Sequence, residues 1–179
     1  MKIYTRAGDD GTTGLFYGGR VRKDDPAPAA YGAVDEAQAF LGLARAECEP
    51  GSELADTLVH LARDLWVLMA ELATAPDNRH KLVPGTTLVT AEMVAALEPR
   101  IDRSTERFAM PTDFVIPGGS RLSALLDVAR TVVRRAERAA LAAAADGSHV
   151  VAYLNRLSDL LWALAREHED GLLRAKDVH

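Results

Sequence analysis

A short stretch in the second half of the chain gathers residues whose types and spacing suit phosphate binding. At intervals of three and four residues it contains Asp127, Arg130, Arg134, Glu137 and Arg138, with Arg135 beside them. On a helix this spacing places the five residues on one face. Arginine suits phosphate because its planar guanidinium group donates two parallel hydrogen bonds. The alternative, a solvated face with incidental ion pairs, stays open at this point.

The last apolar segment carries polar residues at positions where a helix does not favour them. Opposite its leucines, one face would present Asn155, Asp159, Trp162 and Arg166. Asparagine and aspartate lower helix stability, because their side chains compete for backbone hydrogen bonds. Taken alone, the four residues are expected on the surface, but their cost to the helix indicates that a ligand or partner needs them.

Glycine is concentrated near the start of the chain, in a polar segment that precedes every expected helix. Gly8, Gly11 and Gly14 allow backbone amides to approach a ligand closely, and Thr12 and Thr13 add hydroxyl donors. Such loops bind phosphates through clustered amide groups. The segment is not a P-loop or a dinucleotide-binding turn, because no Gly-Lys-Ser/Thr sequence and no strand–helix order accompany it. A merely flexible segment is the alternative.

Two expected helix starts extend this set of polar groups. A proline, two glycines and a serine at 117–120 would leave free amides at a helix N-terminus, although an ordinary turn is the alternative. Asp35 and Glu36 lie near the start of an earlier helix, where acidic residues usually complement the helix dipole. Asp35 is also a candidate partner for one of the arginines, within the chain or across an interface.

The sequence gives no sign of a metal centre or of covalent catalysis by the protein. None of the five histidines has a glutamate three residues before it, as a di-iron helical bundle requires. A single cysteine, Cys48, cannot build a cysteine-rich zinc site, and no Gly-x-Ser-x-Gly nucleophile turn occurs. We therefore expect no protein-bound metal, and we expect the chemistry to belong to bound molecules.

Composition limits the class of protein further. The 179 residues suit one domain, 48% of them are apolar, and the net charge is −5, which excludes a disordered chain and a global basic surface for nucleic acid. One cysteine excludes an internal disulfide. No apolar run reaches the ~20 residues of a membrane span, and charged residues from Arg6 onward exclude a secretory leader. We expect a cytoplasmic protein that binds neither nucleic acid nor membranes.

Helical periodicity fills most of the chain beyond the glycine-rich segment, and the low aromatic content of 6% favours packed helices over a sheet. Asp25 and Pro26 mark the first start, Pro99 predicts a kink in the third helix, and Ser120 is the expected N-cap of the fourth. The tail after Gly171 is polar and is expected to fray. The predicted helices span residues 29–47, 53–74, 90–108, 120–145 and 150–167. Five helices joined by short loops predict an all-α bundle.

Five blocks of the chain resemble the PduO-type ATP:cob(I)alamin adenosyltransferases. The first is the glycine-rich sequence TRAGDDGTTGL at residues 5–15, and the second is AYGAVDE at 30–36. The central motif of the family resembles FVIPGG at 114–119 and ARTVVRRAER at 129–138, and its C-terminal motif resembles YLNRLSD at 153–159. The blocks follow the order of the family and cover nearly the whole chain, so together they are highly specific.

The resemblance implies one cobalamin adenosyltransferase domain over residues 1–179. Its fold would be a five-helix, up-and-down, ferritin-like bundle at 25–170, with an ATP-covering glycine-rich N-terminal loop at 1–24 and a tail at 171–179. Such chains form homotrimers that bind ATP between subunits, with Mg²⁺ on the triphosphate. They transfer the 5′-deoxyadenosyl group of ATP to the cobalt of reduced cobalamin, giving adenosylcobalamin and triphosphate. A reductase and an adenosylcobalamin-dependent enzyme are the implied protein partners.

The resemblance also implies roles for individual residues. Asp35 and Arg130 match an intersubunit ion pair near the site, and with Arg134 they are the implied catalytic residues. Phe114 matches an aromatic residue that closes the corrin pocket and keeps the lower face of the cobalt free of ligand. Lys23 matches a lysine that contacts phosphate. The positions that match ATP contacts are Thr5, Arg6, Gly8, Thr13, Gly14, Lys23, Arg134, Arg135, Glu137, Arg138 and Asn155.

This chemistry agrees with what the residues predict on their own. Cob(I)alamin is itself a strong nucleophile that attacks C5′ of the ribose, so the step needs no general base. The protein has to align C5′ with the cobalt and neutralise the charge that grows on the triphosphate. Arginines, a lysine and clustered amide groups suit that task.

Two positions depart from the family pattern. The family usually has Asp-Glu-Leu-Asn where this chain has Asp35-Glu36-Ala37-Gln38, and a histidine where this chain has Asp127. Asp127 lies one turn from Arg130 and would compete with Asp35 for that arginine. The departures leave open an ATP-binding paralogue that acts as a sensor or regulator without cobalamin chemistry. A purely structural bundle is a second alternative, which the dense N-terminal motif argues against.

Overall fold

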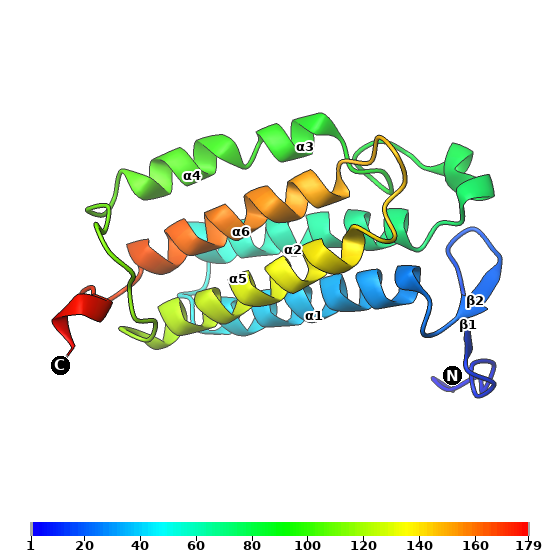
Figure 1. Ribbon diagram of the computed structural model, residues 1–179, viewed down its shortest axis with the longest axis horizontal. Coiled ribbons are helices and arrows are strands. Elements are labelled where there is room, and N and C mark those ends of the chain that lie inside the picture. Colours follow the sequence, from blue (N-terminus) through cyan, green and yellow to red (C-terminus); the bar gives the residue numbers. More distant parts are fainter. Residues whose placement is uncertain (1, 179) are drawn as a thin grey trace.

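Four long helices lie side by side in the computed structural model, which describes residues 2–178 (Figure 1). They are α1 (Pro26–Ala46), α2 (Glu53–Leu72), α5 (Arg121–Ala140) and α6 (Val150–Glu167). α1 packs against both α2 and α5, and α5 packs against α6. Two shorter helices, α3 (Ala91–Ala95) and α4 (Glu98–Thr105), run along α6, so the prediction of a helical fold is confirmed. Within residues 2–178, no helix combines the length and apolar character that crossing a membrane requires.

Leucine stripes and small residues form the core of these helices. The predicted leucine stripes of α2 and α6 are buried, and α1 and α5, which pack against each other, carry six buried alanines. Replacing one such leucine by alanine costs about 2–5 kcal/mol. The leucines are Leu54, Leu58, Leu61, Leu65, Leu68 and Leu72 in α2 and Leu154, Leu157, Leu160, Leu161 and Leu164 in α6, and the alanines are Ala30, Ala37, Ala44, Ala129, Ala136 and Ala140.

Serine side chains fix the starts of two helices. Ser52 accepts a hydrogen bond from the Ala55 N–H, 3.2 Å away, at the start of α2. Ser120 accepts from the Ser123 N–H at 3.0 Å, and the Ser123 hydroxyl accepts in return from the Ser120 N–H at 3.1 Å. The predicted N-cap of α5 is therefore confirmed as part of a reciprocal capping box.

Two predicted helix boundaries are wrong, and one predicted helix start is confirmed. The segment 90–108 forms α3 and α4 rather than one kinked helix, so the described residues hold six α-helices. Pro99 lies in the first turn of α4, where its missing N–H has no helical partner to lose. The predicted N-cap Asp25 and first-turn Pro26 are confirmed at the start of α1, three residues before the predicted range of 29–47. α5 ends at Ala140, where Leu141 is exposed and the following alanines form tight turns.

The glycine-rich segment is not purely a loop. It contains the strands β1 (Thr12–Gly14) and β2 (Arg20–Arg22), which pair antiparallel. Residues 17–19 all have positive φ angles and turn the chain between the strands. The hairpin tip is attached to the end of α2, where the Phe16 N–H donates to the Ala73 carbonyl oxygen at 2.9 Å. Strands of three residues are too short to show an alternating pattern in the sequence.

The C-terminal tail pairs with another segment, which corrects the expectation that it frays. The Ala175 N–H donates to the Phe114 carbonyl oxygen at 2.8 Å, and the Ile116 N–H donates to the Leu173 carbonyl oxygen at 2.8 Å. The tail thus lies against the loop before α5, at the end of the bundle opposite the hairpin (Figure 1). This pairing fixes the backbone on both sides of Val115.

Candidate functional site

The polar stripe of α5 forms one face together with α6. Arg134 and Arg138 are exposed on it, and Arg138 Nη1 donates to the Arg134 carbonyl oxygen at 3.0 Å. The Arg134 guanidinium group forms no hydrogen bond or ion pair among residues 2–178. Asn155 Nδ2 donates to Glu137 Oε1 at 3.0 Å and joins α6 to α5. The face therefore presents an unpaired cation beside an amide–carboxylate pair, which suits an anionic ligand that also carries polar groups.

Arg135 points toward α1 instead of this face. It forms an ion pair with Glu36, and both side chains are about half exposed. Because α1 and α5 pack against each other, this pair is one contact of their interface. Consecutive residues of a helix point roughly 100° apart, which separates Arg135 from Arg134 although the two are adjacent in the sequence.

Arg130 belongs to a network of charged groups in which only its contact with Asp127 was expected from the sequence. Its Nε donates to Asp127 Oδ1 at 2.9 Å, and Arg166 of α6 donates to the other oxygen, Oδ2. Arg166 Nε lies 2.9 Å from Glu169 Oε2, and Glu169 Oε1 accepts from the Gly119 N–H at 3.2 Å. A β-carbon at Gly119 would lie 2.5 Å from the Glu169 side chain, so this close approach favours glycine. This network of charged groups links α5 and α6 to the loop before α5.

The expectation that Arg166 lies on the surface is therefore wrong. Its side chain is 2% exposed, because two carboxylates pair with it inside the fold. Its guanidinium group also lies 6.0 Å from the centre of the Trp162 ring, within range of a cation–π contact. A helical pattern shows which residues share a face, but not whether another element covers part of that face. Asn155 and Asp159 are exposed, as predicted.

Asp35 and Arg130 do not meet within one chain. Asp35 is exposed on α1 and forms no hydrogen bond or ion pair in the part of the chain that the structure describes. Arg130 is paired with Asp127 in the single chain, and competition between Asp127 and Asp35 for this arginine stays a prediction. An ion pair between Asp35 and Arg130 across subunits stays a prediction.

In the N-terminal segment, an arginine that the sequence did not single out shapes the backbone. Arg20 donates to the Ala7 carbonyl oxygen and, through Nε, to Thr12 Oγ1 at 3.1 Å. The N–H and the hydroxyl of Thr12 both donate to Asp10, which holds the pKa of that carboxyl below its usual range. These contacts fold residues 7–12 into a compact turn without any ligand.

Lys23 lies beside this turn. A β-carbon at Gly8 would lie 3.2 Å from Lys23 Nζ and 3.0 Å from the Thr12 carbonyl oxygen, so glycine gives the lysine room. Lys23 and Arg6 form no ion pairs among the described residues, and Arg6 lies 5.7 Å from the centre of the Tyr4 ring. The segment thus presents two cations beside backbone amides. Three further predicted contacts lie in the same segment: Thr5, Thr13 and Gly14.

Phe114 is exposed at the other end of the bundle. Its side chain is 86% exposed, so the alternative in which it anchors the loop in the core is wrong. Its backbone is held at both sides, because its N–H donates to Asp113 Oδ1 and its carbonyl oxygen accepts from Ala175, each at 2.8 Å. An exposed ring on a fixed backbone is well placed to contact a flat apolar ligand.

One chain does not bring all the predicted residues together. Within residues 2–178, no hydrogen bond or ion pair joins the N-terminal segment to the polar face of α5 and α6. The loop that carries Phe114 lies far from the hairpin along the bundle (Figure 1). Phe114 and the N-terminal segment therefore do not share one site within a single chain.

Gln38, one of the two departures from the family pattern, is used within the fold. Its Nε2 donates to the Ala62 carbonyl oxygen at 2.7 Å, and its Oε1 accepts from Trp66 Nε1 at 3.2 Å. Both contacts join α1 to α2. The residue thus has a structural role whether or not it also contacts a ligand.

Comparisons with known proteins agree on one family. Residues 3–168 match the family described as cobalamin adenosyltransferase. The chain is 45% identical over 170 residues to the corrinoid adenosyltransferase of Mycobacterium tuberculosis, which covers 92% of this chain and 87% of the relative. It is 42% identical over 173 residues to the corrinoid adenosyltransferase of Bacillus subtilis, with 93% of this chain and 86% of the relative covered.

A solved structure is similar over the same region. It is a variant PduO-type ATP:corrinoid adenosyltransferase from Lactobacillus reuteri, complexed with cobalamin and ATP. The similarity has a TM-score of 0.82 at 32% sequence identity and covers 93% of this chain and 90% of that chain. Family, relatives and fold thus point the same way, and this chain belongs to the cobalamin adenosyltransferase family.

Proposed function

We propose that this chain is a corrinoid adenosyltransferase, which transfers the 5′-deoxyadenosyl group of ATP to the cobalt of reduced cobalamin. Relatives that are 45% and 42% identical carry that name, and the similar Lactobacillus reuteri protein was solved with both ligands. The observation that carries the proposal is the face of α5 and α6, where the Arg134 guanidinium group is unpaired beside Glu137 and Asn155. An exposed cation without a protein partner is available to neutralise a triphosphate.

In the proposed reaction, bonds form and break in cobalamin and ATP and not in the protein. Cob(I)alamin attacks C5′ with its own electron pair, the cobalt–carbon bond forms, and the C5′–O5′ bond breaks with its pair leaving on the triphosphate. No proton moves in this step, so no general base is required. The protein contributes by aligning C5′ with cobalt and by stabilising the leaving charge. Arg134, Arg138 and Lys23 are the proposed phosphate partners.

ATP is proposed to bind between subunits of a homotrimer. Two separated groups of unpaired cations support this, since Lys23 and Arg6 lie on the N-terminal segment and Arg134 lies on α5. One subunit would supply Thr5, Arg6, Gly8, Thr13, Gly14 and Lys23, and its neighbour would supply Arg134, Glu137, Arg138 and Asn155. Arg135 would join them by leaving its ion pair with Glu36. Asp35 of one subunit would pair with Arg130 of the next and share this arginine with Asp127.

The proposal also covers the organisation of the chain. Residues 1–179 would form one domain in which 1–24 cover ATP, 25–170 form the helical bundle and 171–179 form a tail. If α3 and α4 are counted as one broken helix, the proposed fold would be a five-helix, up-and-down, ferritin-like bundle. The glycine-rich segment then acts as a hairpin that closes over the nucleotide.

Magnesium is proposed to enter with the nucleotide. In the described part of the chain, no group of three or more histidine, cysteine, aspartate or glutamate side chains could hold a metal ion. Phosphate oxygens are ligands that this cation prefers, so the triphosphate would carry it. The step assigned to this chain's own residues is charge neutralisation by arginine and lysine.

Phe114 is proposed to cover the lower face of the corrin ring. Its exposed ring would displace the axial ligand, which makes the cobalt four-coordinate and easier to reduce. An electron donor must supply the reduced cobalt, so a reductase is a proposed partner in the cytoplasm. An adenosylcobalamin-dependent enzyme would consume the product.

An anaerobic assay with chemically reduced cobalamin and Mg-ATP tests the proposal. We expect the corrin spectrum to change to that of adenosylcobalamin, with triphosphate released in equal amount. ATP binding without adenosylcobalamin would instead identify a paralogue that acts as a sensor or regulator. Binding of neither ligand would leave a structural bundle.

A further inference from the structure

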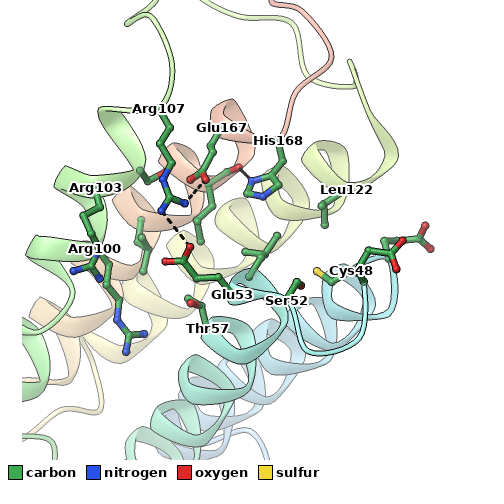
Figure 2. Close-up of a pocket in the computed structure, with 16 residues that line it drawn as sticks. Cys48, Ser52, Glu53, Thr57, Arg100, Arg103, Arg107, Leu122, Glu167 and His168 are labelled. Carbon is green, nitrogen blue, oxygen red and sulfur yellow. Dashed lines mark hydrogen bonds and ion pairs between the residues drawn. The ribbon is translucent and has the colours of Figure 1, made fainter.

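A cavity of about 380 Å³ lies between α2, α4 and α6, at the end of the bundle away from the hairpin (Figure 2). We call it the α2–α4–α6 cavity. Its apolar lining comes from Leu54, Leu122, Leu160 and Leu164. None of the residues proposed to bind ATP or the corrin ring lines it. Its volume is typical of sites for small molecules.

Three arginines of α4 and of the turn that follows it border this cavity. Arg107 is already used, since its Nη2 lies 3.1 Å from Glu53 Oε2 and its Nη1 lies 2.7 Å from Glu167 Oε1 (Figure 2). Arg100 and Arg103 form no hydrogen bond or ion pair among residues 2–178. The cavity lining also contains Glu47, Glu49, Glu53 and Glu167, so positive charge is concentrated only on the side of Arg100 and Arg103. Two guanidinium groups with unused donors favour an anion.

Two buried polar atoms of the cavity lining also lack partners. Ser104 is 3% exposed, and its hydroxyl makes no hydrogen bond in the described part of the chain. The Glu167 side chain is 11% exposed, and its Oε2 is likewise unpartnered while Oε1 binds Arg107. Burying such groups unpaired is unfavourable, so a molecule in the cavity that hydrogen-bonds to them gains affinity. Glu167 Oε2 requires a donor, and the Ser104 hydroxyl can donate or accept.

We propose that the α2–α4–α6 cavity binds a small organic anion that combines a carboxylate, an apolar body and a hydroxyl group. The carboxylate pairs with Arg100 and Arg103, and the apolar body lies on the leucines. The hydroxyl group donates to Glu167 Oε2, and Ser104 adds a hydrogen bond from the wall. The site is separate from those proposed for ATP and for the corrin ring.

Cys48 makes the occupancy of this cavity measurable. It is the single cysteine of the chain, and it lines the cavity opposite α4 (Figure 2). A bound molecule should therefore slow alkylation of the full-length protein by iodoacetamide, which is uncharged and does not compete for the arginines. The probe is para-hydroxyphenylpropanoate, which has all three proposed features. Phenylpropanoate lacks the hydroxyl group, and the amide of the hydroxy acid lacks the charge.

We expect the hydroxy acid to protect Cys48 at millimolar concentration. The amide should bind about tenfold or more weakly, because it loses a charge-assisted contact, and phenylpropanoate should fall between the two. Arg100→Gln and Arg103→Gln should each weaken protection by the hydroxy acid about tenfold. The matched control is Arg22→Gln, which removes an exposed arginine at the hairpin end and should leave protection unchanged. If an arginine variant does not fold, Ser104→Ala provides a second test. It changes no charge, removes the proposed hydrogen bond from the cavity lining and should weaken protection by the hydroxy acid.

Three results would overturn the proposal. Equal protection by the acid and its amide would show a merely apolar cavity. No protection by any probe at these concentrations would show that the cavity does not bind this class of molecule. Protection of Cys48 by Mg-ATP or hydroxocobalamin alone would assign the cavity to the substrates rather than to a separate ligand.

Discussion

Asp127 and Arg166 form an ion pair between α5 and α6 with only 5% and 2% of their side chains exposed. The same carboxylate holds Arg130 through its second oxygen, at 2.9 Å. A buried charge keeps its place only while its partners neutralise it. The pair therefore couples the stability of the bundle to the position of Arg130, one of the proposed catalytic residues.

Arg166→Met should lower the free energy of unfolding by about 3–5 kcal/mol. The substitution keeps a long apolar side chain but leaves Asp127 and Glu169 as buried carboxylates without their shared cation. Urea denaturation followed by circular dichroism measures the change. Arg134→Met is the control, because Arg134 is exposed and unpaired among residues 2–178, and it should change stability by no more than about 0.5 kcal/mol. If both variants lowered the free energy of unfolding equally, the buried ion pair would stabilise the fold no more than an exposed arginine does.

Arg134→Ala should lower turnover about ten- to hundredfold, since a charge-assisted phosphate contact contributes about 1.5–3 kcal/mol. The bundle should stay folded, because this side chain has no contact to lose in the described chain. Adenosylcobalamin formation under anaerobic conditions is the measurement, with melting temperature recorded for the same sample. Arg45→Ala, at an exposed position of α1, serves as the control for loss of a positive charge. Unchanged kinetics would remove Arg134 from the site.

The chain should be a homotrimer in solution with Asp35 paired to Arg130 of a neighbouring subunit. Asp35→Arg and Arg130→Asp should each lower activity, and the double variant should recover part of the loss. Recovery should be incomplete, because aspartate at position 130 would stand beside Asp127 and Arg130 would no longer hold it. Sedimentation at micromolar concentration measures the assembly. A monomeric mass, or additive losses in the double variant, would contradict the pairing.

Phe114→Ala should impair reduction of the bound cob(II)alamin state more than ATP binding. The ring is 86% exposed, so its loss should leave the melting temperature nearly unchanged, whereas loss of a core phenylalanine costs about 3–5 kcal/mol. The cob(II)alamin spectrum, ATP affinity and melting temperature together test this. A large fall in melting temperature with a normal four-coordinate spectrum would show that the corrin ring binds elsewhere.

Alkylation of Cys48 should require a higher pH than alkylation of a small free thiol. Partial burial raises the pKa of the Cys48 thiol, and the charge of Glu47 raises it further. The thiolate is the reactive form, so a raised pKa leaves less of it at neutral pH and shifts the rise in rate upward. Iodoacetamide rates across pH, compared with N-acetylcysteine, give the midpoint. A midpoint at or below that of the reference thiol would contradict the burial seen here.

The parts of the fold that local sequence controls were predictable. The leucine stripes of α2 and α6 are buried as expected, and Ser120 caps α5. The hairpin and the pairing of the tail with the loop of Phe114 were not predictable, because they depend on contacts between distant segments. The end of α5 was misplaced because the alanines after Ala140 favour a helix locally, while the exposed Leu141 gains nothing from continuing it.

In the candidate site, too, features set by local sequence were predictable, and those set by contacts between distant segments were not. Helical spacing placed Arg134, Glu137 and Arg138 on one face, and the structure agrees. It also placed Arg166 on a surface, where it does not lie, because the periodicity of one helix does not show what an adjacent helix contributes. An arginine one turn from the end of a leucine-rich helix, with an aspartate available on another helix, was the signal that would have found the buried pair.

The turn of residues 7–12 has a thermodynamic consequence for ligand capture. Arg20 and Asp10 already fix the backbone there, through contacts to Ala7 and Thr12 that belong to the folded chain. A nucleotide that docks on this segment therefore immobilises fewer free dihedral angles than it would on a disordered glycine-rich strand. The backbone of residues 7–12 loses most of its conformational entropy when the chain folds rather than when the nucleotide binds. The glycines therefore let the nucleotide approach the backbone closely without the entropic cost of ordering a flexible segment.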